Sequence, residues 1–187
     1  MSRSYYYLIS SLPLLRWANP PSMSSDEFLA QCEGQIPADV LADLGDVSLI
    51  PRAECGPSDA EVRWVEWDGY IRNQLVHTRA AHLRQEAAHM LREETGAFPT
   101  DRKELDEILP SDDPLERERA LDHMRWRRLE GMESGHPFDR DRLVIYRLKL
   151  LLLEKWTSFD GDTGSRNLAD LVDAGLRQAS ERRIATE

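Results

Sequence analysis

The side chains best suited to hold a metal ion come together at one place in the sequence, His82, Glu86 and His89. On a helix, spacings of four and three residues put these side chains on one face, within about 40° at roughly 100° per residue. A di-metal bundle needs a second Glu-x-x-His motif on a facing helix. The other such pair, Glu133 and His136, lies in a turn flanked by glycine and proline. We therefore expect a polar helix face here and no bound metal.

Other catalytic and ligand-binding motifs are missing from the sequence. It contains no glycine-rich phosphate loop, no nucleophile elbow and no HExxH pair, the marks of common NTPases, hydrolases and zinc proteases. Residues 160–164 begin like a calcium loop, but Leu171 stands where the bidentate glutamate belongs, so a turn is predicted. The two cysteines, Cys32 and Cys55, have no metal-ligand spacing. The sequence predicts no catalytic centre, no cofactor and no metal.

Composition limits the partners and the location that we expect. Acidic residues outnumber basic ones by 34 to 24, which gives a formal charge of -10, and such a protein repels the phosphate backbone of nucleic acids. The longest apolar run, 143–153, is interrupted by two basic residues and is shorter than the roughly 20 residues of a membrane-spanning helix. The amino terminus lacks the apolar core of a secretory signal. We expect a cytoplasmic protein that binds neither nucleic acid nor the bilayer directly.

The elements that carry these residues are predicted to be helices. Capping boxes, in which a serine is followed three residues later by a glutamate, open helices after Ser24 and Ser58. The first helix should end near Cys32. The second should run to about Thr95, because the stretch contains no proline. A short helix is expected over 37–44, whereas the segment 5–15 is compatible with helix or strand.

Helices are also predicted in the second half of the chain. A short helix over 101–109 precedes Asp113-Pro114, a cap followed by proline at the first position of a helix that reaches Met132. Charged residues of alternating sign follow one another on this helix at three-residue steps. They are interpreted as a solvent-exposed ion-pair ladder: Glu116, Arg119, Asp122 and Arg125.

The helix over 140–158, capped by Asp139, is apolar around nearly its whole circumference. We expect it to form the core, with Leu148 and Leu151 buried. A terminal amphipathic helix is expected over 166–183. The fold class is therefore all-α, an irregular multi-helix bundle. Residues 1–187 form either a single helical domain or two lobes, 1–95 and 114–187, joined by a hinge at about 96–113.

Several residue strings together resemble one known family. They are Tyr5-Tyr6-Tyr7-Leu8-Ile9-Ser10-Ser11-Leu12-Pro13, Arg72-Asn73, Leu75-Val76, Leu115-Glu116-Arg117-Glu118, Arg125-Trp126, His136-Pro137-Phe138, Tyr146, Leu148-Lys149-Leu150 and Glu154-Lys155-Trp156. The chain resembles, over nearly its whole length, the small bacterial helical proteins that are encoded among V-type ATPase subunit genes and are similar in character to the helical C, or d, subunit.

The resemblance implies a non-catalytic adaptor that couples the central stalk of a bacterial V-type ATPase to its membrane ring. Its partners would be central-stalk and membrane-ring subunits, and it would lie at the membrane only through that complex. Candidate partner contacts are Arg72, Asn73 and Trp126, although a tryptophan also commonly packs in a core. Two alternatives stay open: a metal-binding helical bundle that uses the His82 face, and a cytoplasmic regulatory adaptor unrelated to the ATPase.

Overall fold

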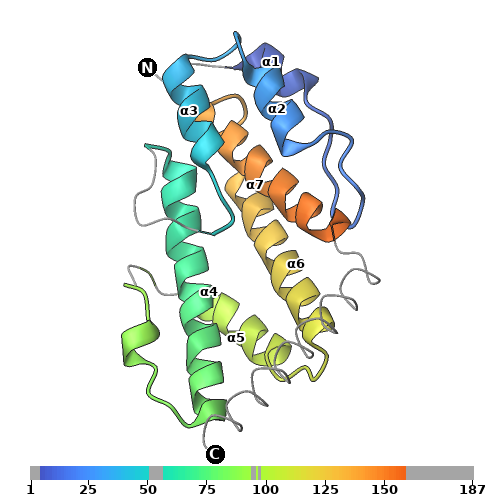
Figure 1. The fold of residues 1–187 in the computed structure, drawn as a ribbon. Coiled ribbons are helices and arrows are strands. Elements are labelled where there is room, and N and C mark those ends of the chain that lie inside the picture. Colours follow the sequence, from blue (N-terminus) through green and yellow to red (C-terminus); the bar gives the residue numbers. More distant parts are fainter. Residues whose placement is uncertain (1–4, 51–56, 94–95, 97, 159–187) are drawn as a thin grey trace, which may run out of the picture. The chain divides into compact units, whose positions relative to one another are not determined.

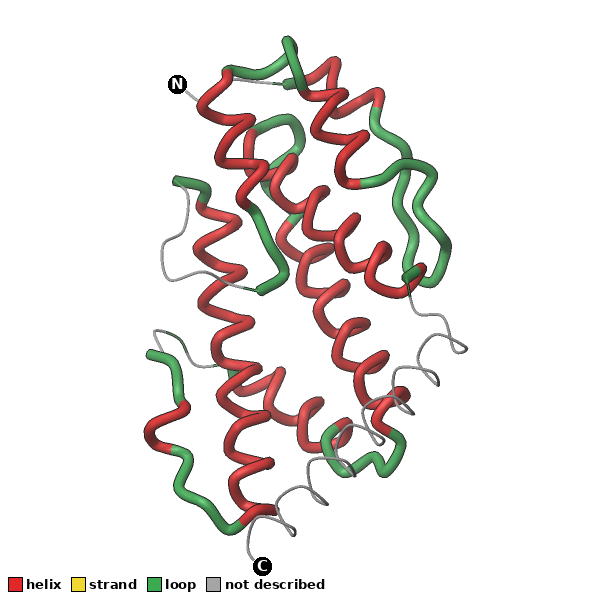
Figure 2. The backbone as a smooth tube through the Cα atoms, in the orientation of Figure 1, coloured by secondary structure: helices red, strands yellow, loops and turns green. Residues whose placement is uncertain are grey.

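The computed structural model describes residues 5–50, 57–93, 96 and 98–158, and within these ranges the chain contains helices and no strand (Figures 1 and 2). The all-α prediction is confirmed for this part of the protein. The elements are α1 (Tyr6–Ser11), α2 (Ser25–Cys32), α3 (Ala38–Asp46), α4 (Asp59–Leu83), the 3₁₀ helix η1 (Ala88–Met90), α5 (Pro99–Ile108), α6 (Pro114–Met132) and α7 (Arg140–Thr157).

Helices α1 and α2 differ in how they start, because α2 has a side-chain cap and α1 has none. The Ser24 backbone N–H donates to the Glu27 carboxylate at 2.7 Å, and the Glu27 N–H donates to Ser24 Oγ at 3.1 Å. The predicted capping box of α2 is therefore confirmed. The segment that was compatible with helix or strand forms the short helix α1, which ends before Pro13, because proline cannot donate to a helical ladder.

Helix α4 starts as predicted, with Ser58 Oγ accepting from the Glu61 N–H at 3.3 Å, but the prediction that it reaches Thr95 is wrong. It ends at Leu83, and Arg84 follows with a φ of +53°. The Gln85 N–H donates back to the Ala80 carbonyl at 3.0 Å, which satisfies a carbonyl at the helix end as in a Schellman-type termination. The chain then turns away and forms η1, so no single helix connects residues 58 and 95.

The helices in the second half of the chain begin and end close to the residues predicted from the sequence. Asp113 Oδ1 accepts from the Leu115 N–H at 2.8 Å and opens α6, and Asp139 Oδ1 accepts from the Arg142 N–H at 3.1 Å near the start of α7. Both predicted caps are confirmed. The predicted helix over 166–183 and the turn at 160–164 lie outside the described residues.

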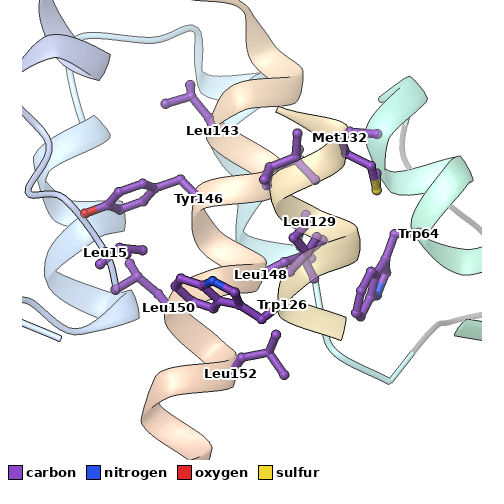
Figure 3. Close-up of a cluster of buried hydrophobic side chains, with 14 of the residues drawn as sticks. Leu15, Trp64, Trp126, Leu129, Met132, Leu143, Tyr146, Leu148, Leu150 and Leu152 are labelled. Carbon is purple, nitrogen blue, oxygen red and sulfur yellow. The ribbon is translucent and has the colours of Figure 1, made fainter. Parts of the chain in front are cut away.

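Helices α4, α6 and α7 carry most of the core, and α6 contacts both α4 and α5. Figure 3 shows side chains of α7, among them Leu148, packed against Leu129 and Trp126 of α6. The burial of Leu148 is confirmed, whereas Leu151 is only half-buried. Leu151 therefore belongs to a strip of α7 that its neighbours cover incompletely.

The chain divides into two compact units, Met1–Glu154 and Lys155–Glu187. In the first unit, one buried hydrophobic cluster takes side chains from both sides of the expected hinge 96–113 and from Leu105 within it. The division into lobes 1–95 and 114–187 remains a prediction. None of the helices in the described ranges has the length and apolar character that a membrane crossing requires.

Candidate functional site

Two of the candidate partner contacts lie inside the protein. Asn73, only 1% exposed, exchanges two hydrogen bonds with the backbone of Arg92: its Nδ2 donates to the Arg92 carbonyl, and the Arg92 N–H donates to its Oδ1, both at 2.9 Å. Trp126 is buried between α6 and α7. Its Nε1 donates to Glu130 at 2.7 Å, and Lys149 Nζ lies 4.4 Å from the centre of its ring. Both side chains hold helices and loops in place.

Arg72, the third candidate contact, belongs to a charge cluster between α4 and α6. Its Nε donates to Asp68 Oδ2 at 2.5 Å, while Arg125 Nε donates to Asp68 Oδ1 at 3.1 Å. Arg125 Nη1 also donates to Asp122 at 2.7 Å. Burial by itself lowers the pKa of Arg125, but the charges of Asp68 and Asp122 outweigh burial, so this pKa is raised. Glu118 also lies 3.9 Å from Arg125 Nη1, so three carboxylates surround two guanidinium groups.

This cluster corrects the interpretation of the α6 ladder for two of its four members, whereas Glu116 and Arg119 are exposed as predicted. Asp122 is 1% exposed and Arg125 is 8% exposed. Sequence reasoning missed the cluster because Asp68, which draws Arg125 inward, is 57 positions away. The signal available in the sequence was Asp68 itself, an acid on the same helix as Trp64, Trp67 and Ile71, which are buried.

The face expected from His82, Glu86 and His89 does not form. His82 lies near the end of α4, Glu86 follows the helix, and His89 is in η1. His82 Nδ1 instead lies 3.0 Å from the carbonyl oxygen of Thr78, one turn earlier. The early end of α4 removes the shared helix on which the geometric argument for this site depended.

A different histidine meets two carboxylates at the turn between α6 and α7. His136 Nδ1 lies 2.8 Å from Asp139 Oδ2 and 3.3 Å from Asp141 Oδ2. Within the described residues, these three form the one group of histidine, cysteine or acidic side chains whose candidate ligand atoms all lie within 4.8 Å of one another. The spacing His-x-x-Asp-x-Asp across a helix start was the sequence signal for it, and the sequence reasoning set this turn aside.

Polar groups of α7 fasten the N-terminal helices. Arg147 donates to the Gly45 and Val47 carbonyls at the end of α3, at 3.0 and 3.3 Å, and Tyr146 Oη donates to the Pro13 carbonyl at 2.9 Å. Burial beside these residues raises the pKa of the Cys32 thiol to about 11. A thiol that stays protonated near neutral pH is a poor nucleophile, so Cys32 is a packing residue.

Large apolar side chains are exposed at several places in the first unit, which include Ile50, Val62 and Leu115 as well as two regions near its ends. Tyr7 and Leu14 are 86% and 77% exposed in and after α1, and Leu83 and Met90 are 66% and 43% exposed at and beyond the end of α4. Figure 1 places α1 and the C-terminal end of α4 at opposite ends of this unit. We call these the α1 region (Tyr7 and Leu14) and the α4-end region (Leu83 and Met90).

Comparison with known proteins identifies a family for this chain. The family model described as "Protein of unknown function (DUF2764)" matches residues 71–178, which is more than half of the chain. Neither a curated protein nor a solved structure matches. The matched range contains the end of α4, the buried partners Asp122 and Arg125, and the His136 turn.

Proposed function

This chain belongs to the DUF2764 family of proteins of unknown function, and we propose that it is a non-catalytic helical adaptor of a bacterial V-type ATPase. In this role it couples the central stalk to the membrane ring. It lies in the cytoplasm and reaches the membrane only through the complex.

The two exposed apolar regions carry the proposal. An adaptor must contact two partners at once, and it needs apolar anchors at each contact, because buried apolar and aromatic side chains supply most of the affinity of protein interfaces. The α1 region and the α4-end region provide such side chains at opposite ends of one compact unit. Isolated exposed apolar residues, such as Ile50, Val62 and Leu115 here, are common on protein surfaces. The support for this role is that exposed apolar side chains occur near both ends of the unit.

The packing between these regions supports a body that can transmit force. Helix α4 spans much of the distance between them, and Asp68 joins it to α6 through the buried Arg125. The segment beyond α4 is fastened through Asn73 and Arg92. Groups that are hydrogen-bonded and buried resist relative movement of the helices that carry them.

The resemblance of the residue strings supplies the identity of the partner. All of those strings except the first, Tyr5 to Pro13, lie within the matched range 71–178. A formal charge of -10 favours basic partner surfaces and faster association at low salt. A cytoplasmic regulatory adaptor unrelated to the ATPase would use the same two regions, and the experiment below distinguishes the two roles.

The test is to purify the ATPase from the native host with this protein tagged, and to repeat the purification from a deletion strain. We expect stalk and ring subunits to accompany the tagged protein. The double variant Tyr7→Ser with Leu14→Ser should lose one set of subunits, and Leu83→Ser with Met90→Ser should lose the other. Leu115→Ser, which changes an exposed leucine on α6, is the matched control and should retain both.

Two results would overturn the adaptor role. The first is that the protein never accompanies the ATPase while the motor assembles and couples normally in the deletion strain. The second is that both double variants retain every subunit, because the exposed apolar regions would then not be the contacts. Capture of other cytoplasmic proteins in place of ATPase subunits would favour the regulatory alternative.

A further inference from the structure

Within the described part of the chain, two carboxylates converge on one imidazole at the turn between α6 and α7. Asp139 and Asp141 direct their Oδ2 atoms at the same atom, His136 Nδ1, at 2.8 and 3.3 Å. The neighbouring arginines do not serve these carboxylates: Arg140 pairs with Asp43 at 2.6 Å, and Arg142 pairs with Glu133 at 2.7 Å. Within the described part of the chain, His136 is therefore the basic side chain that contacts both aspartates.

The other oxygen of each carboxylate, Oδ1, accepts hydrogen bonds at the start of a helix. Asp139 Oδ1 accepts from the Arg142 N–H at 3.1 Å. Asp141 Oδ1 accepts from Ser58 Oγ at 2.5 Å and from the Ala60 N–H at 3.2 Å, at the start of α4. These bonds satisfy the amides at the two helix starts and fix both carboxylates in orientation. Hydrogen bonding of one carboxylate oxygen in this way is typical of outer-shell support in metal sites.

The turn that carries these groups is itself held on two sides. Gly135 adopts a φ of +95°, which a glycine accepts without strain. The Phe138 carbonyl accepts from the Tyr5 N–H at 2.6 Å, and the rings of Tyr6 and Phe138 lie 4.6 Å apart. All three polar side chains remain partly exposed, between 16% and 25%. An ion can thus reach groups whose positions are already set.

We propose that His136, Asp139 and Asp141 form a binding site for a divalent transition-metal ion. An imidazole nitrogen with two carboxylate oxygens is a ligand set for zinc or manganese, and water fills the remaining positions. On binding, the imidazole loses any Nδ1 proton, and the three ligand atoms move slightly apart to admit metal–ligand bonds of about 2.0–2.2 Å. Because Asp141 also holds Ser58 and Ala60, the bound ion braces the starts of α4 and α7.

Isothermal titration calorimetry tests the proposal. The full chain is first treated with a chelator and is then titrated with zinc chloride. Cobalt chloride gives a second readout, because bound Co²⁺ acquires visible absorption bands that depend on its ligands. We expect one ion per chain at micromolar concentrations. His136→Gln and Asp139→Asn should each weaken binding at least about tenfold. Asparagine also caps helices well, so Asp139→Asn removes the charge of the ligand and keeps the start of α7.

The matched control is His82→Gln, which replaces an exposed histidine on α4 and should bind both ions as the unchanged protein does. Circular dichroism of each variant shows whether it is folded. The proposal is overturned if the unchanged protein binds neither ion. It is equally overturned if folded His136→Gln and Asp139→Asn bind with undiminished affinity, or if His82→Gln abolishes binding, since the ion would then lie elsewhere.

Discussion

At the scale of single residues, Asp68 shows how buried charge is balanced in this protein. Its side chain is fully buried, and each of its oxygens accepts from a different guanidinium group, that of Arg72 or that of Arg125. Removing a carboxylate from water costs several kcal/mol, and close, well-aligned partners are needed to offset that cost. The stability of the contact between α4 and α6 should therefore depend strongly on this one negative charge.

We expect Asp68→Asn to lower the free energy of unfolding by about 3 to 5 kcal/mol. The amide keeps the size of the carboxylate, but it leaves Arg125 with less compensation and turns an NH₂ donor toward a guanidinium donor. Urea denaturation at neutral pH measures the change. Asp106→Asn is the control, because Asp106 pairs with Arg102 on the surface, where such pairs contribute little. Equal effects of the two substitutions would contradict the importance of the buried cluster.

At the scale of elements, the end of α4 is set by an arginine in a conformation that usually requires glycine. Arg84 has a φ of +53°. Residues with a Cβ adopt this left-handed backbone conformation at a cost of about 1–2 kcal/mol. The contact of Asn73 with Arg92 offsets that cost, since it satisfies backbone groups of the returning segment. The helix therefore ends without a local stop signal.

Arg84→Gly should raise the free energy of unfolding by about 0.5 to 1 kcal/mol, because glycine removes the conformational cost although it adds entropy to the unfolded chain. Arg79→Gly changes an exposed arginine within α4 and should instead lower stability by about 1 kcal/mol, since glycine is a poor helix former. Thermal and urea unfolding of both variants measure the difference. A loss of stability in Arg84→Gly would show that its side chain is needed.

At the scale of the whole first unit, α7 connects the N-terminal helices to α6. It contacts the N-terminal helices through Tyr146 and Arg147, and α6 through Lys149, which pairs with Glu133 at 2.8 Å. The exposed apolar regions used in the proposed adaptor role are on other elements, α1 and the end of α4. Substitutions in α7 should therefore act on folding before they act on partner binding.

Leu148→Ala should destabilise the protein by about 2 to 5 kcal/mol, the usual cost of a cavity in a close-packed core. Leu151→Ala is the internal comparison, and its cost should be about 1 kcal/mol because the side chain is only half-buried. Denaturant unfolding of the two variants tests this order. Similar losses would mean that Leu151 is more enclosed than the described helices indicate.

The starts of the helices could be predicted from the sequence, and so could the all-α class. A capping side chain bonds to a backbone group two or three residues away, as Ser24, Asp113 and Asp139 do. Such contacts form wherever the rest of the chain lies, so their patterns are readable without tertiary structure. The burial of α7 could likewise be predicted from the sequence, because a helix that is apolar around nearly its whole circumference must be enclosed by other helices.

Only the tertiary structure decided where α4 ends, which charges are buried, and how the candidate metal site is attached to the start of α4. The Asn73–Arg92 contact spans 19 positions, the Asp68–Arg125 pair spans 57, and the bond from Ser58 to Asp141 spans 83. The energy of each depends on two distant segments arriving together, and neither segment alone carries a pattern for it. The sequence therefore determined the helices, while the packing of those helices determined which polar residues meet.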